Sequence, residues 1–214
     1  LFAPNDIAEK SLRDLGGSVQ KKLTIEDLYS LEQYSRIRES YRKEILAHKS
    51  ERNLVVGNHV RLLFEDRKTI QYQIQEMLRV EKIFEQQGIQ DELDTYNPLI
   101  PDGSNWKGTM LIEYPEPEQR QKALSLLVGI EEQVWVRIDN GDKIFAIADE
   151  DLDRSTSEKT SSVHFLRFEL VTKQAKNLDI SVPITIGIDH NNYRYQTDIC
   201  KATKESIIKD LDQT

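Results

Sequence analysis

The residues best able to bind a metal ion are the histidines and a few carboxylates spread along the chain. His48, Glu65, Glu76 and His164 fall in or beside expected helices and strands, and a divalent metal ion accepts imidazole and carboxylate ligands. We take these four as candidate metal ligands. Glu44 and His48 can share a helix face, although such a pair is often only a surface contact. The sequence contains no Glu-x-x-His pair of the kind that di-iron helices use.

His164 is the histidine that we most expect to be buried. It lies in an expected strand over residues 160–170 and shares a face with Leu166 and Phe168, because alternate side chains of a strand point the same way. A buried imidazole needs a hydrogen-bond partner. The favoured interpretation is a core histidine satisfied by a carboxylate or a backbone group. A metal-binding or proton-transfer role is the alternative.

Several carboxylates allow two interpretations. Hydrolysis by paired acids would need two of them about 5–10 Å apart in a pocket, whereas neighbouring arginines offer ion pairs instead. Ion pairing is favoured because the sequence supplies arginines that can pair with these carboxylates. The carboxylates are Glu65, Glu76, Glu81, Glu113, Asp149 and Glu150, and the arginines are Arg67, Arg79, Arg154 and Arg167.

A second candidate site combines a polar helix with the loop that follows it. The helix expected over residues 66–87 carries more hydrogen-bonding side chains beside its apolar stripe than core packing requires. In the next loop, Ser104, Asn105 and Lys107 could cradle an anion, while Trp106 could cover a ligand or pack into the core. The sequence thus predicts a polar site or docking surface. Its candidate residues are Gln75, Glu76, Arg79, Arg67, Asn97, Asp102, Lys107, Glu113 and Arg167.

Familiar catalytic signatures are absent from the sequence. It has no phosphate-binding loop of the nucleotide-hydrolase type, no dinucleotide-binding glycine pattern, no nucleophile elbow and no zinc-protease helix motif. These absences disfavour nucleotide hydrolysis and nucleotide-dependent redox chemistry. The acidic, hydroxyl-rich stretch over residues 149–160 suits either a solvated loop or a hard-cation site, and the solvated loop is the default interpretation.

Composition further limits the classes of function. The chain of 214 residues has a formal net charge of −8, from 37 acidic and 29 basic residues, and this negative charge disfavours nucleic-acid binding. No apolar run approaches the roughly 18–20 residues that cross a bilayer, and residues 1–20 lack a secretion-signal pattern. A cytoplasmic protein with neither nucleic-acid nor membrane partners is therefore expected.

Cys200 is the only cysteine. An internal disulfide, a thiolate zinc site and an iron–sulfur cluster held by this chain alone are therefore excluded. We expect Cys200 to be inert and half-buried at the end of a strand, because the sequence shows no activating base beside it.

The chain divides into an arm and a domain. Residues 1–20 are expected to form a flexible N-terminal arm that ends near the joint Gly16-Gly17-Ser18, and residues 21–214 are expected to form a single domain. Thr24 has the side chain and the position to cap the first helix. Gly88 is expected to end the second helix, because glycine readily adopts the left-handed conformation found there.

Turn signals predict most of the strands. Gly57-Asn58, Asn140-Gly141 and residues 189–192 each separate two expected strands, and residues 160–171 form a further long strand. A short polar helix is expected over residues 173–178. Helices and hairpins alternate without a regular strand–helix–strand repeat. The predicted fold class is therefore α+β, with a mostly antiparallel sheet built from hairpins, packed helices and an N-terminal arm.

Several phrases stand out by their order and spacing. They are LT at 23–24 with DL at 27–28, AHK at 47–49, LFEDR at 63–67, YQIQEMLR at 72–79, YNPLIPDG at 96–103, IEYP at 112–115, and EKTS at 158–161 leading into VHFLRF at 163–168. Together they resemble a bacterial family of unknown function, DUF3501, from Lys22 to the C-terminus. The candidate residues in these phrases include His48, Glu65 and His164, and Lys159 joins them, although the family supplies no catalytic residue to carry over.

The resemblance also implies a biological setting. Members of the family are often encoded beside rubrerythrin-like proteins and cysteine-rich proteins similar to heterodisulfide reductase subunits, which suggests a role near non-haem iron or iron–sulfur redox chemistry. Our leading expectation is an accessory or interaction protein that binds such a partner and holds no redox cofactor itself. The alternative is a metal-dependent enzyme with His and Glu ligands to a divalent metal ion. A weaker alternative is a small-anion-binding protein. Self-association is left open.

Overall fold

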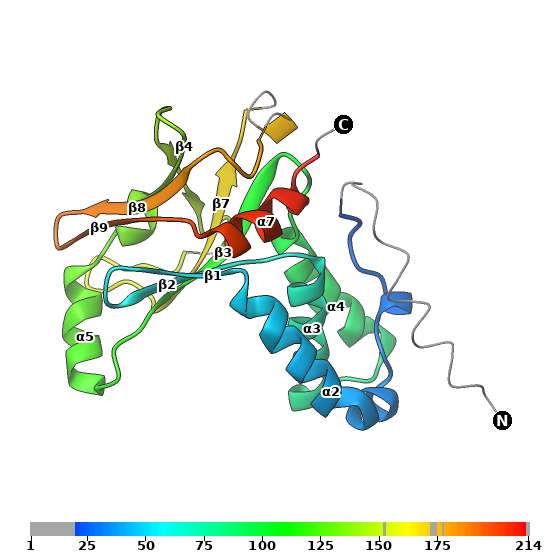
Figure 1. Ribbon diagram of the computed structural model, residues 1–214. Coiled ribbons are helices and arrows are strands. Elements are labelled where there is room, and N and C mark those ends of the chain that lie inside the picture. Colours follow the sequence, from blue (N-terminus) through cyan, green and yellow to red (C-terminus); the bar gives the residue numbers. More distant parts are fainter. Residues whose placement is uncertain (1–19, 152, 172–174, 177, 213–214) are drawn as a thin grey trace.

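The fold consists of two antiparallel β-sheets with helices gathered mainly on one side (Figure 1). The computed structural model describes residues 20–151, 153–171, 175–176 and 178–212. The predicted α+β class and its antiparallel hairpins are confirmed. The expected arm lies outside the described residues except for Gln20, which hydrogen-bonds to Asp210 and to the backbone of Arg67.

The first sheet contains one hairpin predicted from a turn signal, and the second contains two. In spatial order, the first sheet contains β1 (Asn53–Val56), β2 (Val60–Phe64), β3 (Asn105–Ile112), β7 (Val163–Glu169) and β6 (Ile147–Ala148). The second contains β5 (Ile144–Phe145), β4 (Val134–Ile138), β8 (Ile184–His190) and β9 (Tyr193–Asp198). Gly57 joins β1 to β2 with a φ of +73°, a conformation that glycine adopts without strain.

The chain changes sheets between β5 and β6. Phe145 pairs with Trp135 in the second sheet, and Ile147 pairs with Arg167 in the first. Only Ala146 separates the two short strands, and its N–H donates to the carbonyl of Val134 at 2.8 Å. This short stretch therefore forms one edge of both sheets.

The main hydrophobic core lies between the two sheets and includes Trp106 and the chain neighbours of Trp135, Val134 and Val136. Trp106 is fully buried, and its indole N–H donates to the carbonyl of Ile207 at 2.9 Å. The core interpretation of Trp106 is thus confirmed, and no ligand-covering role is needed. The core also receives Phe64, Phe168 and Ile186 from both sheets.

A second hydrophobic cluster lies among three helices, α2 (Leu31–Ser50), α3 (Arg67–Glu81) and α4 (Gln86–Tyr96). The residue that caps the first long helix is Ser30 and not the predicted Thr24. Thr24 caps only the 3-10 turn η1 (Ile25–Asp27), while Ser30 caps α2 by accepting a hydrogen bond from the N–H of Gln33. Two polar caps in succession stop the chain from continuing as one helix.

The predicted end of the second helix at Gly88 is wrong. α3 ends at Glu81 because Lys82 adopts the left-handed conformation, with a φ of +57°. A new helix, α4, starts at Gln86 and contains Gly88. The helical periodicity on both sides of this turn is similar, so the sequence pattern hides the break.

The remaining helices are short or lie apart from the three-helix layer. They are η2 (Asn97–Leu99), α5 (Pro117–Leu126), η3 (Ile130–Gln133), α7 (Lys201–Ile207) and η4 (Ile208–Asp210). The predicted polar helix over residues 173–178 falls mostly outside the described residues. Among the helices that are described, none has the length and apolar character to cross a membrane.

Cys200 differs from its expected environment. It precedes α7 and is exposed, because β9 ends before it and the chain turns outward into the helix. A hydrogen bond with Thr203 lowers the pKa of its thiol.

Candidate functional site

Polar side chains of α3 form hydrogen bonds with other segments of the same chain. The amide of Gln75 is fully buried and makes two hydrogen bonds of 3.0 Å, one to the N–H and one to the carbonyl of Tyr29. Gln71 donates to the carbonyl of Asp27 at 2.6 Å. These amides replace backbone pairing for a segment that has no regular structure, which explains why a largely buried helix face carries glutamines.

Glu76 holds α2 against α3. Its carboxylate accepts hydrogen bonds from Tyr34 at 2.6 Å and from Arg38 at 2.7 and 2.9 Å, and Arg79 lies 3.1 Å away. The hydrogen bond from Arg38 is the main reason that the pKa of Glu76 falls to about 2. This residue is therefore a structural ion-pair partner.

The low pKa of Glu76 predicts a pH-dependent contribution to stability. Because this pKa lies below its unfolded value, the stabilisation is complete above about pH 4.5 and is lost as the pH falls toward 2. Glu76→Gln should lower the free energy of unfolding by about 1–2 kcal/mol at pH 7 and by much less near pH 2.5. Urea unfolding across this range measures the difference.

Glu113→Gln is the matched control for that experiment. Glu113 also pairs with an arginine, Arg61, at 2.9 Å, but both side chains are about one-third to one-half exposed. An exposed pair contributes little, so its removal should cost less than about 0.5 kcal/mol at any pH. A constant difference between Glu76→Gln and wild type across the pH range would contradict the prediction.

The other predicted polar residues also have partners within the chain. Asn97 bonds to both backbone groups of Leu23, and Lys107 donates to the carbonyl of Pro98. Asp102 accepts from the N–H and hydroxyl of Ser104. Arg67 pairs with Asp27, Arg79 with Glu76, Glu113 with Arg61, and Arg167 with Glu150 and Glu169. These contacts are distributed over separate elements, so the favoured ion-pairing interpretation describes them well.

The four predicted metal ligands do not meet at one point. His48 lies 2.6 Å from Asp66, and Glu65 accepts from the hydroxyls of Thr69 and Thr109. Within the described residues, the single group of at least three His, Cys, Asp or Glu ligands within 4.8 Å of one another contains His164 with two other residues, Glu131 and Asp149.

His164 is buried at the centre of this cluster. Its Nδ1 lies 2.6 Å from Oδ2 of Asp149, and its Nε2 lies 2.9 Å from Oγ1 of Thr160 and 3.0 Å from the carbonyl of Ser161. Oε2 of Glu131 lies 3.9 Å from the same Nε2. The predicted inward orientation of His164 is confirmed.

Each member of the cluster comes from a different element. His164 is on β7, Glu131 is on η3, and Asp149 follows β6. Asp149 has a φ of +49°, which is unfavourable for a residue other than glycine. Its carboxylate compensates by accepting from the N–H of Phe165 at 3.0 Å as well as contacting His164.

Hydroxyl groups complete the surroundings of Glu131. Thr160 donates to Oε2 at 3.2 Å, and Ser155 is also hydrogen-bonded to the carboxylate. Arg154 offsets part of the negative charge because its Nε lies 3.8 Å from Oδ1 of Asp149. That guanidinium is also paired with Asp151 at 2.7 Å. The cluster is thus rich in oxygen donors and acidic overall.

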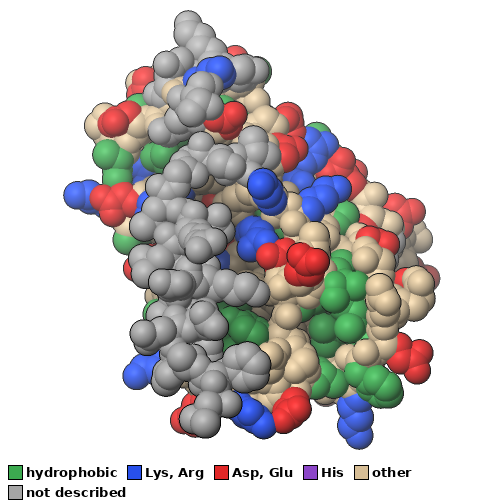
Figure 2. Space-filling model, turned by 90° about the vertical axis from the view of Figure 1, so that its right-hand side faces the viewer, with side chains coloured by type: hydrophobic (Ala, Val, Ile, Leu, Met, Phe, Trp, Pro, Cys, Tyr) green, Lys and Arg blue, Asp and Glu red, His purple; other side chains and the backbone are tan. Residues whose placement is uncertain are grey.

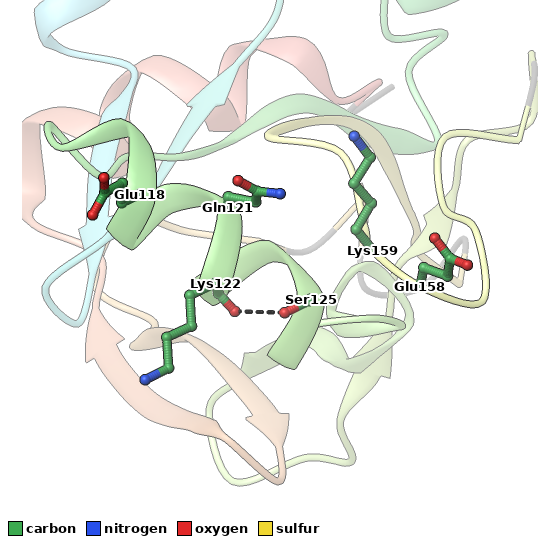
Figure 3. Close-up of a pocket in the computed structure, with 6 residues that line it drawn as sticks. All are labelled: Glu118, Gln121, Lys122, Ser125, Glu158 and Lys159. Atoms are coloured by element: carbon green, nitrogen blue, oxygen red, sulfur yellow. Dashed lines mark hydrogen bonds between the residues drawn. The ribbon is translucent and has the colours of Figure 1, made fainter.

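Two surface grooves are also present among the described residues. One, of about 450 Å³, separates α5 from the loop at residues 158–159 (Figure 3). Gln121 and Lys159 approach each other across it, whereas Lys122 and Glu118 point elsewhere. The other groove, of about 550 Å³, lies beside His59. On the face shown in Figure 2, acidic and basic side chains are intermingled over the described surface.

The fold is α+β, and it brings a histidine and two carboxylates from three elements into one cluster. The chain belongs to the family DUF3501, described as a protein of unknown function, whose model matches residues 22–211. The resemblance found in the sequence is thus confirmed. Among curated proteins, none matches the chain.

A solved structure shows the same fold at substantial sequence identity. It is described as a novel protein of unknown function from Burkholderia pseudomallei K96243. It is 50% identical to this chain, with a TM-score of 0.85, and the match covers 90% of this chain and 100% of the other. Neither comparison tests the expected association with redox proteins, so that association stays a prediction.

Proposed function

We propose that the protein binds a divalent transition-metal ion between His164 and Glu131, with Asp149 holding the imidazole from its other nitrogen. The observation that carries the proposal is the convergence of two carboxylates on one buried imidazole from three separate elements. A histidine that only needed a partner in the core would be satisfied by Asp149 alone. The second carboxylate adds negative charge to a buried site, and Arg154, which is also paired with Asp151, offsets only part of it.

The distances are compatible with an ion beside Nε2 of His164. Metal bonds of about 2.0–2.2 Å to nitrogen and oxygen place two ligands of one ion up to about 4.4 Å apart, and Nε2 lies 3.9 Å from Glu131. The hydroxyl of Thr160 and the carbonyl of Ser161 are within reach of the same position. Asp149 would then hold the imidazole from the opposite nitrogen, a common arrangement around metal-bound histidines.

The donor set favours particular metals. One imidazole combined with carboxylate, hydroxyl and carbonyl oxygens suits Zn²⁺, Fe²⁺ or Mn²⁺ better than the all-oxygen ions Ca²⁺ and Mg²⁺. With His164 and Glu131 as ligands, such an ion could polarise a bound substrate or water. The proposal therefore retains the predicted metal chemistry of His164 but replaces His48, Glu65 and Glu76 as its partners.

Metal content and affinity test this proposal. We expect about one Zn²⁺, Fe²⁺ or Mn²⁺ per chain after metal-supplemented expression, and one-site binding by titration calorimetry after metal removal. His164→Gln and Glu131→Gln should each reduce affinity at least tenfold. Glu131→Gln preserves the size of the side chain, so it reports on binding even if the variant at His164 is unstable.

His48→Gln is the control that separates the two ligand sets. His48 contacts Asp66 in another part of the fold, so its loss should leave metal affinity unchanged. If wild type binds none of these metals at millimolar concentration, or if His48→Gln weakens binding as much as Glu131→Gln does, the proposed site is wrong. The cluster would then be a buried network that anchors residues 149–160.

A further inference from the structure

A groove at one end of the first sheet gathers polar groups that the fold does not use. It lies between the β1–β2 turn, the end of β3 and the start of α5. Its volume of about 550 Å³ is in the range of small-molecule sites. Leu111, Tyr114 and Val163 contribute apolar lining, and Asn58 and Arg120 contribute polar lining.

Several side chains in this groove lack internal partners, unlike those of α3. In the described part of the chain, the side chains of Asn58, Arg120 and Ser162 make no hydrogen bond or ion pair. Arg120 is exposed on the first turns of α5, and Glu116, one turn earlier, forms no ion pair with it. An arginine with no neutralising partner in a groove attracts an anion.

The other charged groups of the groove are already balanced. Glu113 is paired with Arg61 through two contacts of 2.9 and 3.1 Å, so its carboxylate does not neutralise Arg120. His59 is held in place because its Nδ1 lies 3.1 Å from the carbonyl of Glu113. The backbone N–H of His59 donates to the hydroxyl of Tyr193 at 2.9 Å.

The groove that contains Arg120 also has a planar aromatic surface. The rings of His59 and Tyr114 are stacked with centroids 3.9 Å apart and planes inclined by 17°. Such a pair leaves ring faces or edges for a planar group, and Leu111 and Val163 extend the apolar surface. The groove therefore combines recognition of a negative charge with recognition of a planar apolar body.

We propose that this groove binds a small organic anion whose carboxylate or phosphate pairs with Arg120 and whose planar part lies against His59 and Tyr114. Asn58 and Ser162 donate further hydrogen bonds to the anionic group. This assignment places anion binding away from the loop at Asp102 and Lys107, whose polar groups are internally bonded. It is also separate from the metal cluster, because Val163 and His164 are adjacent on β7 and point to opposite faces.

Titration calorimetry with matched probes tests the proposal. Benzoate and phenyl phosphate represent the carboxylate and phosphate forms of the anion, benzamide is an uncharged analogue of similar shape, and inorganic phosphate lacks the planar body. We expect the preferred aromatic anion to bind at least tenfold more tightly than both benzamide and inorganic phosphate. The preference between benzoate and phenyl phosphate identifies the anionic group.

Substitutions locate the binding to the groove. Arg120→Gln should weaken binding of the preferred anion about tenfold or more, and Tyr114→Leu should reduce its advantage over inorganic phosphate. Lys122→Gln removes a cation from the same helix but outside this groove, so it should change nothing. Absence of aromatic-anion binding at 10 mM, equal binding of benzamide, or equal losses in Arg120→Gln and Lys122→Gln would each overturn the proposal.

Discussion

Arg52→Met is expected to lower the free energy of unfolding by about 3–5 kcal/mol, because it leaves buried carboxylates without their cation. The guanidinium is 1% exposed. It donates to the carbonyls of Phe64 at 2.8 Å and Glu65 at 3.1 Å, and it is bonded to Asp210. Asp66 lies 3.5 Å from it.

The acids around Arg52 explain the expected size of this loss. Burial raises the pKa of Asp210 to about 6 even beside Arg52. Burial also acts to raise the pKa of Asp66, but the hydrogen bond from His48 and the charge of Arg52 hold that pKa at about 2. Removing Arg52 takes the cation and its hydrogen bonds away from both buried carboxylates, and a methionine side chain replaces neither.

Chemical denaturation at pH 7 measures this effect, with Arg61→Met as the control. Arg61 is on β2 and forms a partly exposed pair with Glu113, so its replacement should cost less than about 1 kcal/mol. Arg52→Lys should fall between Arg52→Met and wild type, because it keeps the charge but cannot reach every partner. Similar losses for Arg52→Met and Arg61→Met would refute this account of the buried network.

Gly187→Ala is expected to destabilise the second sheet by about 3 kcal/mol or more. A Cβ atom at this position would lie 2.2 Å from Cζ2 of Trp135 and 2.6 Å from its Cε2. Trp135 is directly opposite Gly187 on the neighbouring strand and is 1% exposed. The indole cannot move aside without disrupting the packing around it.

A double-mutant cycle isolates the clash from other effects of alanine. Trp135→Ala alone should be destabilising because it leaves a cavity. Adding Gly187→Ala to that variant should cost less than about 1 kcal/mol, since the ring that opposes the new methyl group is gone. If Gly187→Ala costs the same in both backgrounds, contact with the indole is not the cause.

Local turn chemistry made much of the fold predictable. Gly57-Asn58 and residues 189–192 marked hairpins that the structure confirms, because such turns depend on a few neighbouring residues. The break at Lys82 was not predictable in this way. A lysine rarely adopts the left-handed conformation, and only the packing of α4 against α3 accounts for the turn there.

The candidate site was predictable only for its central residue. Alternation along β7 placed His164 in the interior, because strand periodicity is a local property. Asp149 and Glu131 join it from elements earlier in the chain, and the sequence gives no local signal for such a meeting. The partners of the polar face of α3 were unpredictable for a related reason, since Gln75 and Glu76 are bonded to segments about 40 residues earlier.

The passage of the chain from β5 to β6 across Ala146 has a consequence for self-association. Long, unpaired edge strands can recruit strands from other polypeptides. Here the edges of both sheets on one side are formed by strands of two residues each, which offer little backbone for such pairing. The short segment from β5 to β6 therefore disfavours fibril-like strand addition at this edge of both sheets.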